Sequence, residues 1–509
     1  MTNFRVKSPW KIARISTIAT LSFIVCWGFA MVVAEIKPFW IDEWRVIYNL
    51  KYKDATMLWG PLDFLQQFPR VYLEIVKVFT SIFDYSYFAL RLPSFIVGTA
   101  MIALCYRLMV KIFRRESFNR FLFVMMLVSA STFTDYYVEI KQYTMDLLLA
   151  LVAIWQFIEL LKLTNGQPKI SGRYMWLCAS FLVVPFFSYT YPIAIAPVFI
   201  IQFVQGVILL RDKRVTTGKT RILLQQWFPL FLCAASIVVF YMTDVKQLMA
   251  DKGMHQYWGH LMMNKGFSWS SFFYECYNMF AEIGAGAVYW YLFGVLGVVS
   301  FLYGVFVCVA NIKRKQQSAS DLILLYSALL VLIAILLFST GKFPLGEPRL
   351  NAFMIPVIAV LLIRLLDGLS EHRRWNIVSK TVSVVLLAGV TGNVYTTFYA
   401  SLTGPEYTRK MEIYRSTEKA LLMAQSKKLP TMITPEVAWP YDKTRNYPFN
   451  NTVPGDWVLK TFPAYHVANN MPVYAITNMA SLREEMKRLP ANITSVLAGD
   501  GRSFSIIIR

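Results

Sequence analysis

The chain has 509 residues, of which 56% are hydrophobic and 16% are charged, and its mean hydropathy is +0.45. So apolar a composition excludes a soluble globular protein, which would have to hide each apolar segment in a core. The net charge of +21 would also suit a nucleic-acid-binding protein, so the positions of the Lys and Arg residues decide between the classes.

Long apolar runs recur through the first 400 residues. A helix of about 20 apolar residues crosses the roughly 30 Å hydrocarbon layer of a bilayer. Eleven segments meet this requirement: 17–34, 86–106, 119–134, 143–161, 174–188, 190–210, 226–243, 286–310, 322–339, 349–366 and 377–396. The sequence therefore predicts a polytopic α-helical membrane protein with about 11 transmembrane helices.

Basic residues concentrate in every second loop. If the N-terminus is inside, the inner segments 1–16, 107–120, 162–173, 211–221, 311–321 and 364–380 contain 24 Lys and Arg in 81 residues. The opposite segments, 35–85, 135–143, 244–285 and 340–349, contain 12 in 112 residues. The positive-inside rule therefore predicts a cytoplasmic N-terminus and an extracytoplasmic C-terminus. The net charge then reflects topology and contact with membrane lipids, and no nucleic-acid partner is expected.

The first outer loop, 35–85, begins with the stretch Trp-Ile-Asp-Glu-Trp-Arg at residues 40–45. Its two adjacent acids, Asp42 and Glu43, are either ordinary loop charges or part of an active site. Further along the loop, apolar residues recur at helical spacing over 72–79. Such amphipathic segments lie along a membrane surface.

The short outer turn before the fourth span carries several polar side chains. If the helix begins near residue 138, Glu139, Tyr143 and Asp146 lie on one face, at spacings of four and three residues, whereas Lys141 points toward the membrane interface. Glu139 and Lys141 either cap and solubilise a tight turn or have a chemical role. In the second case Glu139 supplies a carboxylate for an acceptor hydroxyl or a metal, and Lys141 contacts a phosphate.

Ionisable residues are nearly absent from the centres of the spans, where each would cost roughly 2.5–3.5 kcal/mol. The exceptions, Arg91, Asp146 and Arg349, lie near the predicted outer ends. Arg349 either reaches a phosphate with two hydrogen bonds or extends its charge to the interface. An ion-coupled transporter would place carboxylates near the midplane, so the pattern favours chemistry on the outer face.

The membrane domain is expected to cover residues 1–398, with a second long outer loop at 244–285. Residues 399–509 are more polar and are punctuated by proline. They contain expected helices at 406–426 and 480–488 and a final strand-like run. We expect a small extracytoplasmic domain of the α/β or α+β class.

Five stretches follow one another along the chain: the acids Asp42 and Glu43, Gln-Phe-Pro-Arg-Val-Tyr-Leu at 67–73, Phe-Ala-Leu-Arg-Leu-Pro-Ser at 88–94, Glu-Ile-Lys-Gln-Tyr at 139–143 and Glu-Pro-Arg-Leu at 347–350. Together they resemble the GT-C superfamily of integral membrane glycosyltransferases. The resemblance is to bacterial relatives of the protein O-mannosyltransferases and of the aminoarabinose transferase of lipid A. It covers about residues 1–366. Members often have His-Pro-Pro where this chain has Gln67, Phe68 and Pro69, so no histidine role is implied there.

The resemblance implies an enzyme of the bacterial inner (plasma) membrane. Such enzymes take a sugar from a polyprenyl-phosphate donor and transfer it, with inversion, to a glycan, lipid or protein acceptor on the outer face. The implied catalytic residues are Asp42, which acts as general base or orients the acceptor, its neighbour Glu43, and Glu139, which in some relatives contributes to metal binding or to acceptor positioning. Lys141 and Arg349 are implied to contact the donor phosphate, with Arg91 and Tyr143 in support.

A divalent metal ion that bridges a carboxylate and the phosphate is compatible with these residues, with Asp42 and Glu139 as candidate ligands, and no other cofactor is expected. Two other functions remain open. A transporter of lipid-linked sugars or polysaccharides would need a polar path through the bilayer. A non-catalytic membrane scaffold would use residues 399–509 to bind a glycan or a protein.

Overall fold

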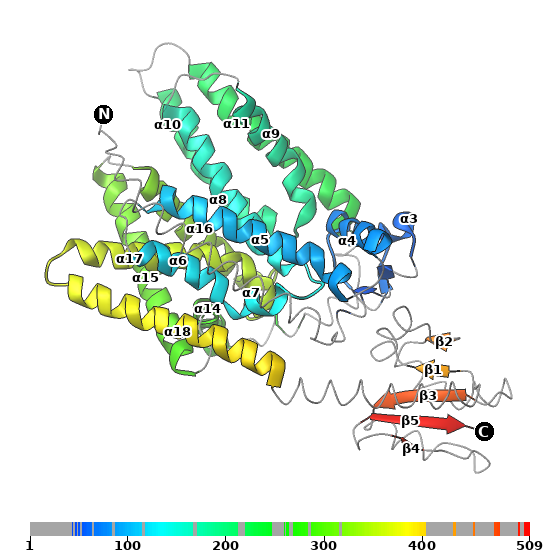
Figure 1. The fold of residues 1–509 in the computed structure, drawn as a ribbon. Coiled ribbons are helices and arrows are strands. Elements are labelled where there is room, and N and C mark those ends of the chain that lie inside the picture. Colours follow the sequence, from blue (N-terminus) through cyan, green and yellow to red (C-terminus); the bar gives the residue numbers. More distant parts are fainter. Residues whose placement is uncertain are drawn as a thin grey trace, which may run out of the picture. The chain divides into compact units, whose positions relative to one another are not determined.

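Figure 1 shows the computed structural model, in which helices make up most of the first 400 residues. The structure describes residues 43, 46–47, 49–50, 53–63, 66–83, 87–113, 118–165, 171–211, 219–246, 259, 261–263, 268–283, 287–314, 318–403, 431–433, 451–452, 473–478, 497–498 and 503–508. The chain divides into two compact units. One comprises Met1–Met31, Gln67–Glu74 and Pro93–Thr397, and the other comprises Val32–Gln66, Ile75–Leu92 and Phe398–Arg509.

The α-helices are, in chain order, α3 (Ala55–Leu58), α4 (Arg70–Phe83), α5 (Tyr87–Ile112), α6 (Phe118–Ser129), α7 (Ser131–Tyr136), α8 (Tyr143–Asn165), α9 (Gly172–Val183), α10 (Tyr191–Arg211), α11 (Lys219–Phe240), α14 (Trp269–Ala281), α15 (Ala287–Arg314), α16 (Ala319–Ser339), α17 (Ile355–Glu371) and α18 (Asn376–Thr403). Three further turns differ from α-helix: the 3₁₀ turns η2 (Val184–Phe187) and η4 (Pro348–Met354), and the π-helical turn η3 (Tyr241–Val245).

Within the described residues, eight helices are long and apolar enough to cross a membrane: Ala89–Ile112, Tyr143–Lys162, Tyr191–Arg211, Leu223–Val245, Val288–Asn311, Ala319–Ser339, Pro348–Glu371 and Asn376–Tyr395. Two predicted spans appear as the shorter apolar helices Phe118–Ser129 and Gly172–Phe187. The first predicted span, 17–34, lies outside the described residues. The prediction of a polytopic α-helical membrane protein is confirmed, and the count of eleven spans stays a prediction.

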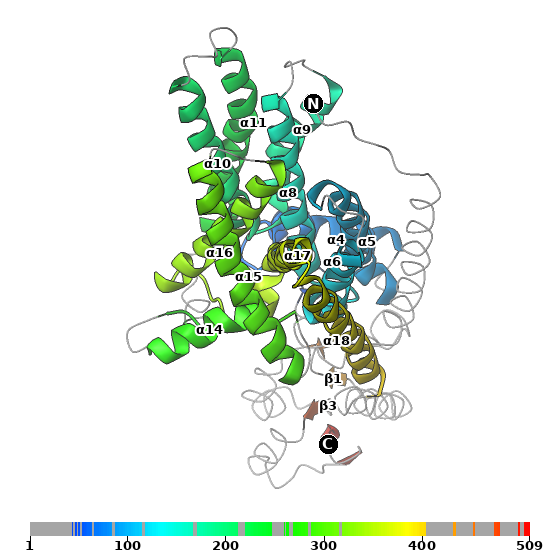
Figure 2. The same cartoon turned by 90° about the vertical axis from the view of Figure 1, so that its left-hand side faces the viewer.

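Helix α17 lies in the middle of the helices, as Figure 2 shows by viewing it nearly end-on. It contacts α6, α8, α15 and α16, and its residues from Ile355 to Ile363 are all buried. A helix that is apolar all round suits such a position. By contrast, α15 and α18 expose large apolar side chains such as Phe306 and Ile377, as expected of surfaces that face lipid.

The close packing of α5 against the turn after α7 depends on a glycine. The ring of Tyr137 stacks on Phe95 and Phe133, with centroids 4.6 and 4.8 Å apart, and a Cβ added at Gly98 would come within 2.2 Å of that ring. We expect Gly98→Ala to lower the free energy of unfolding by about 1–3 kcal/mol through overpacking, measured by thermal denaturation in detergent. In Gly392→Ala, the matched helical control, the added Cβ meets no atom within 4 Å. Equal melting temperatures for the two variants would contradict this packing argument.

Residues beyond 403 are described as five short strands: β1 (Thr431–Ile433), β2 (Asn451–Thr452), β3 (Val473–Asn478), β4 (Leu497–Ala498) and β5 (Ser503–Ile508). They form one sheet in the order β2-β1-β3-β5-β4. The strand β1 is parallel to both β2 and β3, whereas β5 is antiparallel to β3 and β4. The predicted helices at 406–426 and 480–488 lie outside the described residues, so the domain class and its boundary stay predictions.

Candidate active site

Of the two adjacent acids at the start of the first predicted outer loop, the structure describes Glu43, which is fully buried and paired with Arg91. The Arg91 guanidinium donates from Nε to Glu43 Oε1 at 3.2 Å and from Nη2 to Oε2 at 3.0 Å. This two-pronged geometry is the strongest form of ion pair between side chains. It fixes the orientation of Glu43, which therefore serves better to hold its segment than to accept a proton. Asp42, the predicted base, lies outside the described residues.

The turn before α8 is tighter than the sequence suggested. Helix α8 begins at Tyr143, not near residue 138. Before it, the backbone N–H of Lys141 donates to the Glu139 carbonyl at 2.9 Å, which closes a turn too tight for a helix. The expected alignment of Glu139 with Tyr143 and Asp146 on one helical face is therefore wrong.

Burial bears on the first of the two roles considered for this turn, in which Glu139 and Lys141 cap and solubilise it. Glu139 and Lys141 are 5% and 3% exposed, so neither solubilises the turn and Lys141 does not point to an open interface. The Ser94 hydroxyl contacts the Lys141 carbonyl at 3.4 Å and the Tyr72 hydroxyl at 3.0 Å. A buried carboxylate and a buried ammonium group in one tight turn favour a chemical role.

The aromatic residue Tyr143 starts α8 and packs against Tyr136 edge to face, with ring centroids 4.6 Å apart. Three residues later, Asp146 accepts a hydrogen bond from the Ser188 hydroxyl. Ser188 Oγ in turn accepts from the backbone N–H groups of Thr190 and Tyr191, both at 3.1 Å. Asp146 therefore anchors the break between η2 and α10.

Arg349 lies in η4, where its Nε is 2.6 Å from Glu347 Oε1. Its side chain is 13% exposed and paired with Glu347, so it does not extend freely to the membrane interface. Other acids lie near Glu347. Burial raises the pKa of Glu282 well above its usual value, and the negative charges of Glu347 and Glu275 raise it further. Arg349 therefore supplies a positive charge close to several acids. The 3₁₀ turn η4 packs against α7 and α8, the helices that flank the Glu139–Lys141 turn.

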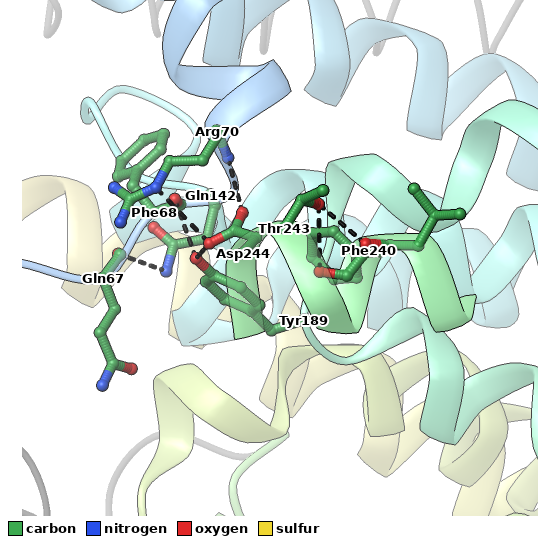
Figure 3. Close-up of polar contacts among 9 residues, drawn as sticks. Gln67, Phe68, Arg70, Gln142, Tyr189, Phe240, Thr243 and Asp244 are labelled. Carbon is green, nitrogen blue, oxygen red and sulfur yellow. Dashed lines mark hydrogen bonds and ion pairs between the residues drawn. The ribbon is translucent and has the colours of Figure 1, made fainter. Parts of the chain in front are cut away.

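A network that the sequence did not predict joins the segment before α4 to the end of α11 (Figure 3). Asp244 accepts from the backbone N–H of Arg70 at 3.1 Å, and its Oδ1 lies 3.5 Å from Arg70 Nε. The Tyr189 hydroxyl lies 2.8 Å from Asp244 Oδ1 and 3.0 Å from the Phe68 carbonyl. Burial and the neighbouring carboxylate of Asp244 raise the pKa of Tyr189 well above its usual value, so this hydroxyl stays protonated and donates.

Two local features place this network. The π-helical turn η3 carries Asp244, and the hydroxyl of Thr243 in this turn donates to the Val239 carbonyl of α11 at 2.9 Å. Such turns are frequent at functional sites. On the other side, the Gln142 side chain donates from Nε2 to the Gln67 carbonyl at 3.4 Å. The signals in the sequence were an acid directly after the predicted span 226–243 and the segment 67–73 singled out by the resemblance.

These contacts bring together the segments 67–72, 137–142, 188–190 and 243–245, which we call the four-segment cluster. Helices α8 and α10 begin at it and α11 ends at it, so it lies on one side of the membrane. Three of the predicted site residues, Glu139, Lys141 and Tyr143, lie in it or directly after it. Glu43 and Arg91 belong to the other unit of the chain.

A metal ion would need several oxygen, nitrogen or sulfur ligands in one place. Among the residues that the structure describes, no three His, Cys, Asp or Glu side chains are grouped so as to hold one. Because Asp42 lies outside those residues, the predicted pair of metal ligands Asp42 and Glu139 stays a prediction.

No protein-family model matches the chain, and no curated protein matches it significantly. Solved structures of one protein, ArnT, match over nearly their whole length. The crystal structure of ArnT from Cupriavidus metallidurans bound to undecaprenyl phosphate aligns with a TM-score of 0.56 and 12% identity, over 97% of this chain and 98% of that one. The same protein in the apo state aligns with a TM-score of 0.53 and 12% identity, over 98% of both chains.

The helices and the four-segment cluster thus define a polytopic membrane protein with polar groups gathered on one side of the bilayer. The chain shares the fold of ArnT over nearly the whole length of both chains. The fold implied by the five sequence stretches is therefore confirmed.

Proposed function

We propose that this protein is a membrane glycosyltransferase that moves a hexosyl or pentosyl group from a polyprenyl-phosphate donor to an acceptor hydroxyl. The acceptor is a glycan, a lipid or a protein. The reaction takes place on the outer face of the inner (plasma) membrane and inverts the configuration of the anomeric carbon. The N-terminus of the protein is cytoplasmic and its C-terminus is extracytoplasmic.

The observation that carries the proposal is the burial of acidic and basic side chains together in the four-segment cluster of a GT-C fold. Charged residues inside membrane proteins are costly and usually mark functional sites. Here Glu139, Lys141, Arg70 and Asp244 are all at most 5% exposed. The fold-level relative ArnT was crystallised with undecaprenyl phosphate, a lipid phosphate of the kind proposed as the donor's carrier.

The proposed mechanism is a single displacement. The acceptor oxygen attacks the anomeric carbon while the bond from that carbon to the phosphate oxygen breaks, and polyprenyl phosphate leaves with the bonding electrons. Asp42 takes the proton of the acceptor hydroxyl, and Glu139 positions that hydroxyl. Lys141 and Arg349 stabilise the negative charge that grows on the leaving phosphate, which favours the transition state over the bound donor.

Within this mechanism the pair of Glu43 and Arg91 holds the segment next to Asp42, since both carboxylate oxygens of Glu43 accept from the guanidinium. Tyr143 supports the turn that carries Lys141. The lipid carrier accounts for the siting of the enzyme, because its tail stays in the bilayer and presents the phosphate at the rim.

Reconstitution in liposomes tests the proposal against its rivals. A polyprenyl-phosphate sugar labelled in the sugar is supplied with candidate glycan, lipid and protein acceptors. We expect the label to move to an acceptor and free polyprenyl phosphate to appear in equal amount. Movement of the intact labelled lipid across the bilayer would indicate a transporter instead, and binding without bond cleavage would indicate a scaffold.

A further inference from the structure

In the four-segment cluster, the side chains of Arg70 and Gln142 have buried polar atoms without a hydrogen-bond partner. Among the described residues, Arg70 Nε and Nη1 have no hydrogen-bond acceptor and Gln142 Oε1 has no donor. Arg70 is 5% exposed and Gln142 is 6% exposed. Unmet buried polar atoms destabilise a fold, so each calls for an explanation, and a ligand that supplies the missing partners is one.

Arg70 is held firmly in place. Asp244 contacts both its backbone N–H and its guanidinium, at 3.1 and 3.5 Å, and the preceding Pro69 restricts the backbone. Tyr189 fixes Asp244 from the other side and also contacts the Phe68 carbonyl two residues before Arg70. A guanidinium held beside a carboxylate in this way can direct its N–H groups at a single ligand.

Gln142 is tied to the same segment, because its Nε2 donates to the Gln67 carbonyl. Figure 3 shows Arg70 and Gln142 beside the chain from Gln67 to Phe68. The unmet groups are complementary: the guanidinium needs an acceptor, preferably an anion, and the amide oxygen needs a donor. A sugar phosphate offers both, since its phosphate accepts and its hydroxyls donate.

We infer that Arg70 binds the phosphate of the lipid-linked sugar and that Gln142 accepts a hydrogen bond from a hydroxyl of that sugar. Asp244 and Tyr189 are positioning residues for Arg70. This inference rests on the proposed function. It adds Arg70 to Lys141 and Arg349 as a third cation that contacts the phosphate, and it adds Gln142 as a residue that binds the sugar.

Binding to the full-length protein in nanodiscs tests the role of Arg70. The probes are undecaprenyl phosphate, undecaprenol, which lacks the phosphate, and inorganic phosphate. We expect Arg70→Gln to weaken undecaprenyl phosphate binding about ten- to one-hundredfold, as loss of a charge-assisted hydrogen bond does, and to leave undecaprenol binding unchanged. Arg364→Gln is the matched control, because Arg364 is 19% exposed and pairs with Asp321 elsewhere. It should leave both affinities unchanged.

Asp244→Asn tests positioning. It removes a negative charge near the ligand, so electrostatics alone would tighten phosphate binding, whereas loss of orientation weakens it. We expect the ratio of undecaprenyl phosphate affinity to undecaprenol affinity to fall, a change that general damage to the fold would not produce. A rise in this ratio would overturn the positioning role.

Gln142→Leu tests contact with the sugar. It should raise the KM for the polyprenyl-phosphate sugar several-fold and leave the binding of sugar-free undecaprenyl phosphate unchanged. If Arg70→Gln does not fold, Arg70→Lys is used instead, which keeps the positive charge but loses the planar guanidinium that can donate two parallel hydrogen bonds. In that variant a lower affinity for undecaprenyl phosphate with unchanged undecaprenol binding supports the assignment.

The outcomes separate this inference from the proposed function. Wild-type protein that does not bind undecaprenyl phosphate overturns both. Wild-type binding that Arg70→Gln leaves intact overturns the inference alone. Loss of inorganic phosphate binding with lipid binding retained identifies a site for a free anion and overturns the assignment to the lipid headgroup.

Discussion

Replacing Asp42 by Asn is expected to lower the kcat of sugar transfer by about 10²- to 10⁴-fold, the usual contribution of a general base. Asn has the shape of Asp but cannot take the proton of the acceptor hydroxyl at neutral pH. Binding of the polyprenyl-phosphate donor should change little, because the base acts on the acceptor. Single-turnover transfer in the reconstituted system, with donor binding measured separately, gives both quantities.

A matched control lies in the same predicted loop. Asp63 is half-exposed and lies 3.4 Å from Lys53, so Asp63→Asn changes the same kind of charge at a surface position. Exposed pairs contribute little, roughly 0–1 kcal/mol, so transfer by this variant should stay close to the wild-type rate. Transfer at the wild-type rate by Asp42→Asn would remove Asp42 from the mechanism.

Sequence alone was sufficient for the membrane class, because the cost of exposing backbone to lipid leaves few solutions to a chain rich in long apolar runs. The predicted spans 143–161 and 322–339 agree with α8 and α16 within a few residues. The predicted span 174–188 is instead α9 followed by the 3₁₀ turn η2, which contains Pro185. A proline lacks the N–H that would continue an α-helix.

The region around Glu139 shows why local periodicity was insufficient. Placing Glu139 on the face of α8 required a helix from residue 138, but the chain closes a tight turn there and buries Lys141. The contacts that bury the turn come from residues distant in sequence, such as Ser94. Spacing along one segment carries no information about them.

The pairing of Arg70 with Asp244 was out of reach for the same reason, since 174 residues separate them. Neither residue has a distinctive spacing to a partner, and Asp244 stands in a π-helical turn that helical periodicity does not predict. The resemblance to GT-C proteins pointed to the segment 67–73 but not to the side chain within it. Arg70 is distinguished by buried polar atoms that have no hydrogen-bond partner, a property that only the three-dimensional structure reveals.

Breaking the ion pair between Glu43 and Arg91 should have the largest effect on stability of any change considered. Both side chains are 0% exposed, so either single variant, Glu43→Gln or Arg91→Met, leaves a buried group without its counter-charge. Removal of one partner of such a pair typically costs about 3–5 kcal/mol. Lys162→Met is the control: Lys162 is 53% exposed beside Glu159, and its loss should cost at most about 1 kcal/mol. Thermal denaturation in one detergent gives the comparison.

The double variant Glu43→Leu/Arg91→Met separates the two possible roles of the pair. Replacing a buried ion pair by apolar residues of similar volume is often neutral for stability, so this variant should be more stable than either single one. If Glu43 only holds the segment next to Asp42, the folded double variant should transfer sugar faster than Asp42→Asn does. If Glu43 takes part in proton transfer, the double variant should be as slow as Asp42→Asn although it is folded. We expect the first result, because both oxygens of Glu43 already accept hydrogen bonds from Arg91.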